Sequence, residues 1–149
     1  MQQFDLIIIG GGPGGYLCAE RAGKAGLRTA LLEKRALGGT CLNEGCIPTK
    51  SLLYCAKQYQ TMLHCEEYGI AAQNVSYDHA AAVVRKDGIV QTLVRGVGAA
   101  MKKHGVTVFP VEGKIAGKTG DLFTVSAGEE LLYAPKLVLA SGSSAVVPP

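Results

Sequence analysis

The sequence predicts an α/β fold in which a parallel sheet is accompanied by a small antiparallel β-meander. Three observations support this fold class. Residues 4–9 form a short β-branched, apolar run suited to a strand covered on both faces, and a second such run at 28–33 follows a helical segment. Short alternating runs separated by turns then occupy the region between residues 109 and 137. With 149 residues and 48% hydrophobic content, the chain fits one domain with a sizeable core.

Composition excludes several classes of protein. The net charge is +3, from 15 Lys and Arg against 12 Asp and Glu, which is too small and scattered for a nucleic-acid-binding surface. The opening apolar run, Leu6 to Ile9, is far shorter than the roughly 20 residues that span a membrane. Met1-Gln2-Gln3 supplies no basic stretch of the kind that precedes a secretory signal. We therefore expect a soluble, cytoplasmic protein without nucleic-acid or membrane partners.

The first elements make one βαβ unit over residues 4–33. The strand at residues 4–9 leads into the loop Gly10 to Gly15, and a helix is expected from Tyr16 to Ala25. Gly26 is suited to end that helix, because glycine adopts the left-handed conformation at low cost. The second strand, at residues 28–33, completes the unit.

Two longer helices follow a polar, glycine-rich loop. The first is expected from Pro48 to about Glu66. The second begins at Asp78, a good N-cap residue, and ends at Gly105. Helical spacing puts five apolar residues on one face of this helix: Val83, Val90, Val94, Val97 and Met101. Three glycines weaken it, at Gly88, Gly96 and Gly98. Further strands are predicted at 106–109 and 137–140, with turns at 117–121 and 127–129.

A glycine pattern, Gly10-x-Gly12-x-x-Gly15, lies between the first strand and the first helix. Such glycines permit a tight turn, let a pyrophosphate approach the backbone, and let the helix pack on the strand. The helix N-terminus presents N–H groups to phosphates. Glu33 closes the second strand about 20 residues on, where an acid can bind ribose hydroxyls. A tight turn alone would also explain the glycines, but the three parts together predict a Rossmann-like, dinucleotide-binding domain, with FAD and NAD equally open.

A second motif, GGTCLNEGCIPTK, spans Gly38 to Lys50 and places two cysteines five residues apart at the start of a helix. A disulfide across so short a loop would stabilise the fold by only about 2 kcal/mol. Zinc or an iron–sulfur cluster needs further ligands at motif spacing, and none follows, so we expect no metal site. Redox chemistry fits better, because a helix N-terminus favours a thiolate and Cys46 is nearer to it than Cys41. Lys50, one turn beyond Cys46, adds positive charge.

The GGGPGG loop, the acid ending the second strand and the GGTCLNEGCIPTK segment together resemble the flavoprotein disulfide reductases, the class I pyridine nucleotide-disulfide oxidoreductases. Within them the CLNxGCIPTK form is most similar to the dihydrolipoamide dehydrogenases, while glutathione and mercuric reductases carry similar segments. The resemblance covers essentially the whole chain. It implies that residues 1–149 are the N-terminal portion of an FAD-binding domain, left incomplete, with the NAD-binding and dimerisation domains absent.

The resemblance implies roles for individual positions. Gly10, Gly12, Pro13 and Gly14 would hold the FAD pyrophosphate, and Glu33 and Lys34 the adenosine ribose. Gly39, Thr40 and Cys41 would lie along the cofactor. Gly113 would contact the adenine end, and Ala140, Ser141, Gly142 and Ser143 would form a turn that closes over FAD.

The implied reaction passes electrons from a dihydrolipoyl dithiol to the Cys41–Cys46 disulfide, then to FAD, then to NAD. Cys46 would be the flavin-side thiol, Cys41 the outer thiol that exchanges with substrate, and Lys50 a group near the reactive edge of the flavin. The implied partner is a lipoyl-bearing protein or a small disulfide. The full-length family forms homodimers and binds NAD in a domain beyond this chain.

The sequence departs from the family in several places. Ser141 replaces the commoner Thr and keeps the hydroxyl, whereas Glu44 lies where the family often has an apolar residue, and its charge should oppose thiolate formation. The family's His–Glu acid/base pair is not matched by any of the three histidines, which we expect at the surface or in helices: His64, His79 and His104. The other cysteines are expected to be free, buried thiols: Cys18, Cys55 and Cys65.

A second hypothesis is a truncated, non-catalytic flavin- or nucleotide-binding module. Such a module would keep the phosphate loop and the cysteine pair without turning over a substrate. By the resemblance, the only dinucleotide fingerprint, at Gly10–Gly15, would be taken up by FAD, so this chain by itself is expected to show no NAD-dependent lipoamide turnover.

Overall fold

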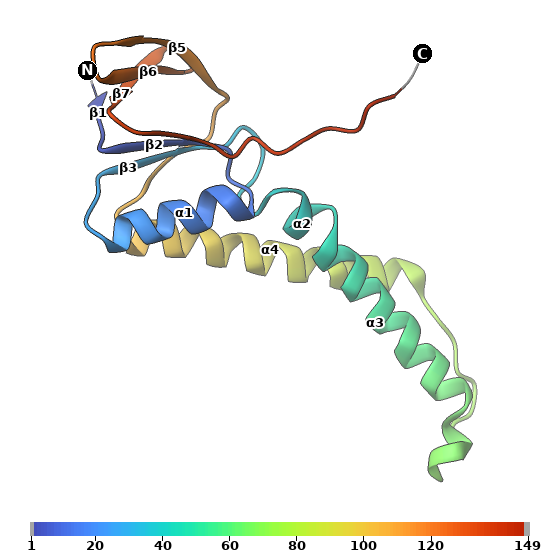
Figure 1. Ribbon diagram of the computed structural model, residues 1–149. Coiled ribbons are helices and arrows are strands. Elements are labelled where there is room, and N and C mark those ends of the chain that lie inside the picture. The colour runs from blue at the N-terminus through green and yellow to red at the C-terminus, as the bar shows by residue number, and fades with distance from the viewer. Residues whose placement is uncertain (1, 148–149) are drawn as a thin grey trace.

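A computed structural model describes residues 2–147 and arranges them in three layers (Figure 1). The middle layer is a parallel sheet of order β4-β3-β2-β8, formed by β2 (Leu6–Ile9), β3 (Thr29–Leu32), β4 (Thr107–Phe109) and β8 (Leu137–Leu139). Helices α1 (Pro13–Lys24) and α4 (His79–Lys103) cover one face. A second sheet of order β1-β7-β6-β5 covers the other, and comprises β1 (Gln2–Gln3), β5 (Gly113–Thr119), β6 (Leu122–Ala127) and β7 (Glu130–Ala134). The predicted α/β fold class is confirmed.

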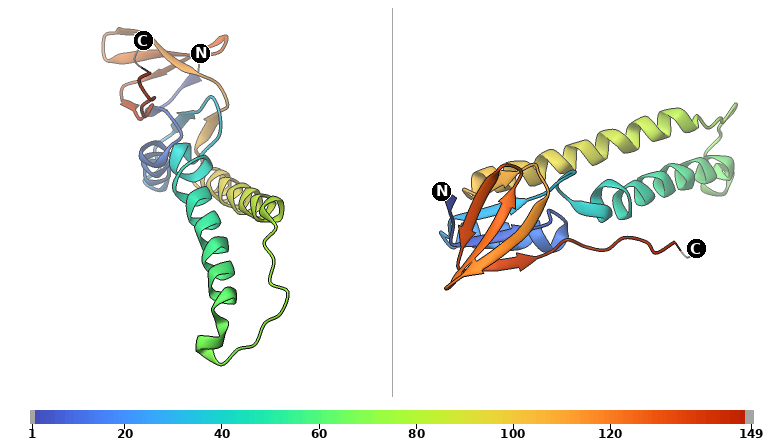
Figure 2. Two further views of the ribbon diagram at one scale, coloured as in Figure 1. Left: turned by 90° about the vertical axis from the view of Figure 1, so that its right-hand side faces the viewer. Right: turned by 90° about the horizontal axis from the view of Figure 1, so that it is seen from above.

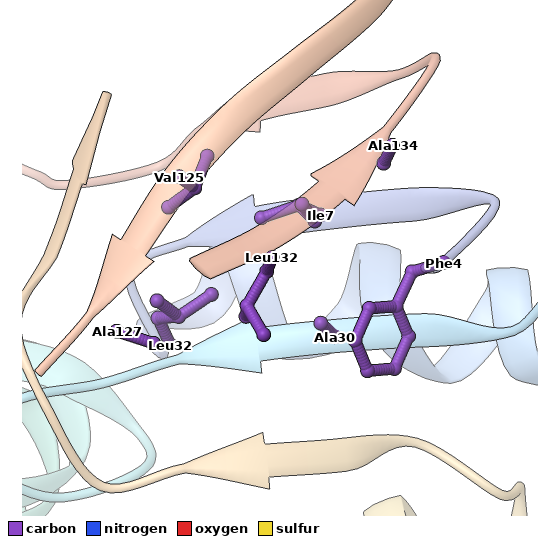
Figure 3. Close-up of a cluster of buried hydrophobic side chains, with 8 residues drawn as sticks. All are labelled: Phe4, Ile7, Ala30, Leu32, Val125, Ala127, Leu132 and Ala134. Carbon is purple, nitrogen blue, oxygen red and sulfur yellow. The ribbon is translucent and has the colours of Figure 1, made fainter. Parts of the chain in front are cut away.

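The central strands are buried on both faces because their alternating side chains feed two separate cores. Ile7 and Leu32 point toward the meander, where they meet Val125 and Leu132 (Figure 3). Their neighbours pack instead against the helices in a cluster that contains Leu6, Ile8, Leu31, Ala19, Ala22, Met101 and Val106. A strand that is buried on both faces must be apolar at every position. These strands therefore lack the alternation of apolar and polar residues that is typical of a half-exposed strand.

Parallel pairing brings the carboxyl ends of three strands to one edge. Ile8 pairs with Leu31 of β3 and with Val138 of β8. Beyond this register the N–H of Gly10 donates to the carbonyl of Leu32 at 2.8 Å. The residues that follow these strands therefore meet at the edge where open α/β sheets bind ligands.

A helical hairpin extends from this body, as both views in Figure 2 show. After the short α2 (Gly39–Asn43), α3 (Cys46–Leu63) runs outward, η1 (Cys65–Tyr68) and a loop reverse the chain, and α4 returns. Asp78 caps α4 as predicted, its Oδ1 accepting from the N–H of Ala81 at 3.0 Å. The predicted valine face of α4 is half-buried and Met101 is fully buried. In the described part of the chain, no helix is long and apolar enough to cross a membrane.

Several predicted boundaries are wrong. Helix α1 begins at Pro13 rather than Tyr16, because proline suits the first helical position and its glycine neighbours continue the turn. Helix α3 begins at Cys46, with Gly45 as N-cap, rather than at Pro48, and ends before Glu66. Cys65 therefore lies in η1 and not in α3.

Two elements were missed. Residues 39–43, predicted as loop, form α2. The predicted strand at 4–9 is preceded by β1, which pairs with β7 in the other sheet. The predicted turn at 117–121 starts later than expected. Strand β5 runs through to Thr119, and the turn begins at Gly120, where φ is 58°. Gly117 pairs with Thr124 and follows an irregularity in the pairing after Ile115.

Candidate functional site

The glycine loop is tightly packed at Gly10 and Gly15 but has open space at Gly12. Gly10 has φ 107°, and a Cβ there would lie 2.2 Å from the carbonyl oxygen of Ala140. A Cβ on Gly15 would lie 1.7 Å from the carbonyl oxygen of Gly10, so α1 can approach the loop only with glycine there. A Cβ on Gly12 would meet nothing closer than the Cα of Gly39, at 3.7 Å. The backbone at Gly12 is thus accessible to a ligand.

Glu33 ties the end of β3 to this loop. Its Oε2 accepts from the backbone N–H of Gly11 at 2.7 Å, and its Oε1 accepts from the N–H of Arg35 at 2.8 Å. A carboxylate offers about four lone-pair positions, so both oxygens can still accept hydrogen bonds from a ribose.

A groove of about 600 Å³ runs past Glu33 between the loop after β3, α2 and the segment after β8. It is lined by Glu33, Lys34, Arg35, Ala36, Gly39, Thr40, Asn43, Glu44, Ser141, Gly142, Ser143 and Ser144. A smaller pocket of about 150 Å³ shares Glu33, Lys34 and Ser141 with the groove and continues to Gly10, Glu112 and Gly113. The two together form one elongated site at the carboxyl ends of the strands.

The smaller pocket is bounded by charged side chains and a constrained glycine. Lys34 Nζ lies 3.1 Å from Glu112 Oε1, and Lys114 Nζ lies 3.5 Å from Oε2. The hydrogen bond from Lys34 is the main cause that lowers the pKa of Glu112. A Cβ on Gly113 would lie 2.8 Å from Cδ2 of Leu32, so glycine keeps this wall close to the strand.

The two cysteines lie beyond the groove, where α2 meets α3. Cys41 is in α2 and is half-buried, whereas Cys46 is the first residue of α3 and is exposed; both are free thiols. Their side chains are hydrogen-bonded, which is the main cause of a raised pKa at Cys41. Burial and the charge of Cys46 also raise that pKa, while the Cys46 backbone N–H and the positive charge of Lys50 lower it.

Two side chains between the cysteines bind the loop after β3. The Nδ2 of Asn43 donates to the carbonyl oxygens of Leu37 at 3.1 Å and Gly39 at 3.0 Å. Glu44 forms an ion pair with Arg35. Arg35 and Asn43 are not among the site residues that the sequence predicts, because a polar residue that binds a neighbouring loop carries no signature in the linear sequence.

The structure brings most of the sequence-predicted site residues together. Glu33, Lys34, Gly39, Thr40, Ser141 and Gly142 line the groove, and Gly10 and Gly113 line the adjoining pocket. Gly12, Pro13 and Gly14 form the N-terminus of α1, and Ala140 packs against Gly10. The other three predicted site residues do not line the groove. Cys41 lies in α2, and Cys46 and Lys50 lie in the first turns of α3.

The histidines and remaining cysteines lie elsewhere. His64 and His104 follow the last residues of α3 and α4, and His79 begins α4. Cys65 is buried, but Cys18 and Cys55 are only half-buried, which corrects the expectation that all three are buried. All three are free thiols, as expected.

Comparison with known proteins agrees with this geometry. The family model described as "Pyridine nucleotide-disulphide oxidoreductase" matches residues 4–149. The dihydrolipoyl dehydrogenase of Acholeplasma laidlawii is 42% identical over 149 residues, covering 99% of this chain and 43% of the relative. That of Pseudomonas aeruginosa is 45% identical over 146 residues, covering 95% of this chain and 32% of the relative. The chain thus spans less than half the length of these relatives.

Two solved structures share the fold over the whole chain. The HOCl-induced flavoprotein disulfide reductase RclA from Escherichia coli, solved as a Cu(II) complex, superposes with a TM-score of 0.77 at 28% identity, and 31% of its chain is covered. LpdA from Mycobacterium tuberculosis gives a TM-score of 0.89 at 18% identity, with 33% covered, and shows the fold alone. From the family match and the fold, this chain belongs to the pyridine nucleotide-disulphide oxidoreductase family.

Proposed function

We propose that residues 1–149 form an FAD-binding domain that carries the redox-active cysteine pair of a dihydrolipoamide dehydrogenase-like oxidoreductase. The proposal rests on one observation: the glycine loop, the groove and the helix that contains Cys41 adjoin one another. Gly12, whose backbone is bare, faces Gly39, and Gly39 begins the helix that contains Cys41. A dinucleotide bound along the groove would therefore approach the thiols.

The residues present fit FAD. The uncapped N-terminus of α1 offers backbone N–H groups to a pyrophosphate, and the open space at Gly12 allows the close approach. Glu33 stands where it can accept from ribose hydroxyls, and the pocket at Gly113 continues the groove toward an adenine. When bound, FAD would supply the two-electron chemistry that links the cysteine pair to NAD.

The cysteine pair itself would perform disulfide exchange. A thiolate of the dihydrolipoyl group attacks Sγ of Cys41, so that a substrate–Cys41 bond forms and the Cys41–Cys46 bond breaks. Cys46 leaves as a thiolate at the N-terminus of α3, where the helix dipole is favourable to an anion. The second substrate thiol loses its proton and attacks the substrate sulfur, which closes the cyclic lipoyl disulfide and releases Cys41 as a thiolate that can take up that proton. Two electrons pass from the substrate to the cysteine pair.

Flavin binding is tested with the purified chain and FAD by equilibrium dialysis. Gly12→Val is the informative variant, because a Cβ at this position has room in the fold, whereas the branched side chain would occupy the space assigned to the pyrophosphate. The matched control is Gly96→Val, on the exposed side of α4, which should bind FAD like the parent. If neither the parent nor the control binds FAD, or if Gly12→Val binds equally well, the cofactor assignment is wrong.

The substrate is tested by single-turnover titration of the oxidised chain. Dihydrolipoamide should yield one equivalent of lipoamide and two new thiols, mapped by mass spectrometry to Cys41 and Cys46. Reduced glutathione is the comparison reagent and should react far more slowly. Faster reduction by glutathione would favour a glutathione reductase-like substrate, and thiols appearing at other cysteines would contradict the assigned pair. In the longer proteins of the family, we propose a lipoyl-bearing partner, NAD and a homodimer.

A further inference from the structure

An acidic residue lies between the two cysteines, and its carboxylate is paired. Glu44 follows the last residue of α2, and its backbone N–H donates to the carbonyl oxygen of Thr40 at 2.9 Å. Its Oε1 accepts from Nη2 of Arg35. Arg35 in turn donates its backbone N–H to Glu33. The ion pair therefore joins the segment between the cysteines to the loop that carries the dinucleotide-binding acid.

Glu44 lies beside the thiols. Cys41 is three residues before it, and the Glu44 N–H that donates to Thr40 closes the last turn of α2, which contains Cys41. At the next residue, Gly45, a Cβ would lie 3.4 Å from the Cα of Cys41, and Cys46 follows directly. One helical turn rises about 5.4 Å, which is within the Debye length of about 8 Å at physiological ionic strength, so the charge of Glu44 is felt at the thiols.

An unpaired carboxylate at this position would oppose the loss of a thiol proton, since like charges repel. The guanidinium of Arg35 offsets that charge and also fixes where the carboxylate lies. We infer that Arg35 is a positioning residue for the dithiol, which by pairing with Glu44 preserves thiolate formation at the Cys41–Cys46 pair. This inference deepens the proposed disulfide exchange and rests on it.

Other charged groups lie on the helices that pack around the cysteine pair, including Lys50 and Lys57 of α3. Lys50 acts on Cys41 from α3. Helix α4 packs against α2 and α3, and its charged residues are Arg85, Lys86, Asp87, Arg95, Lys102 and Lys103. The recorded contacts of three of them lie elsewhere: Arg85 with Ser51 and Cys55, Lys86 with Asp87, and Arg95 with Thr92. Glu44 is thus the acidic group carried by the cysteine segment itself, and Arg35 is its partner.

The test is the rate of iodoacetamide alkylation of the reduced chain as a function of pH, with each cysteine followed by peptide mass spectrometry. Arg35→Gln should slow the summed modification of Cys41 and Cys46 at neutral pH by about twofold to fivefold, the range that exposed ion pairs support. The profile should move to higher pH. Arg35→Lys keeps the charge and should restore most of the rate, and high salt should reduce the difference between the parent and Arg35→Gln.

A double-mutant cycle isolates the interaction. In a Glu44→Gln background, Arg35→Gln should have no effect on alkylation, because the carboxylate that it neutralises is gone. Cys55 is the internal control, since its Sγ contacts Arg85 in the hairpin, away from Glu44. An unchanged rate in Arg35→Gln, an equal slowing in both backgrounds, or a parallel change at Cys55 would overturn the inference. Alkylation requires neither FAD nor dihydrolipoamide, so its result is independent of the tests of the proposed function.

Discussion

The backbone N–H of Gly11 donates to Oε2 of Glu33 at 2.7 Å, so the acid at the end of β3 is fixed against the glycine loop that follows β2. Two segments that are 22 residues apart in sequence thereby form one binding edge. The carboxylate has a structural task as well as a proposed ligand-binding one, because it accepts from the backbone N–H groups of Gly11 and Arg35, which lie in two different loops. Hydrogen bonds to a charged acceptor are among the stronger ones in proteins.

Glu33→Ala should lower both stability and FAD affinity. Removing the carboxylate takes away the hydrogen-bond acceptor of the Gly11 and Arg35 N–H groups. This loss should lower the free energy of unfolding by about 1–3 kcal/mol. FAD affinity should fall about tenfold or more. Urea unfolding and equilibrium dialysis measure the two effects. Glu130→Ala is the control, since it loses a bond to Gln2 in the meander and should leave FAD affinity intact; equal loss in both variants would contradict the role of Glu33.

Gly15→Ala should destabilise the fold strongly, because its Cβ would lie 1.7 Å from a backbone oxygen that cannot move without shifting the loop. We expect a loss of about 3 kcal/mol in the free energy of unfolding, at the upper end for overpacking. Gly14→Ala is the neighbouring control, because its Cβ would find only the Cβ of Ala140 at 3.9 Å. Similar urea midpoints for the two variants would show that the close approach is not as described.

Gly96→Ala should stabilise the chain by about 1 kcal/mol, because the glycine lies within α4 and its Cβ would meet open space. Gly105→Ala should destabilise it by about 1–2 kcal/mol, although its Cβ would also meet open space, since φ there is 67°. The pair of variants separates backbone conformation from packing. Thermal unfolding shifts of the same sign in both would contradict the prediction.

Cys46→Ala should lower the pKa of Cys41 toward its ordinary value. The hydrogen bond that the Cys41 thiol donates to the Cys46 side chain is the largest cause that raises this pKa, and alanine removes both the bond and the charge of Cys46. The alkylation profile of Cys41 should accordingly move to lower pH. Cys65→Ala, at a buried cysteine in η1, should leave the profile unchanged. A shift to higher pH in Cys46→Ala would show that the two thiols are not coupled in this way.

Asp5→Asn should reveal a pH-dependent contribution to stability. The pKa of Asp5 is lowered in the folded chain, chiefly by the backbone N–H of Arg28, which donates to its Oδ2 at 2.7 Å. A lowered folded-state pKa means that the contribution is present above the ordinary Asp value of about 3.9 and is lost as pH falls through the folded-state value. The stability difference between the parent and Asp5→Asn should therefore be larger at pH 6 than at pH 3. Asp121→Asn, in the turn between β5 and β6, is the control; a difference that grows toward acid would refute the assignment.

The sequence by itself determined the βαβ unit, the glycine loop within it, the acid Glu33 that ends the unit, and the cysteine pair. These features follow from local chemistry. A strand buried on both faces must be apolar, a backbone at φ 107° favours glycine at position 10, and Asp78 caps the helix that follows it with its own side chain. Each of these requirements is met by residues next to one another in the chain, so it is visible without a structure.

Only the tertiary structure decided which distant residues share the site. The ion pair of Arg35 with Glu44 depends on α2 being helical and folding back on the loop after β3, and α2 was predicted as loop because five residues carry too little periodicity. Likewise Gly113 is constrained by Leu32, a neighbour that the packing of one sheet on the other brings from 81 positions away. Secondary-structure propensity depends on residues that are neighbours in the chain, whereas packing and strand pairing depend on contacts between distant segments. Those contacts between segments decided where the groove lies and which residue pairs with Glu44.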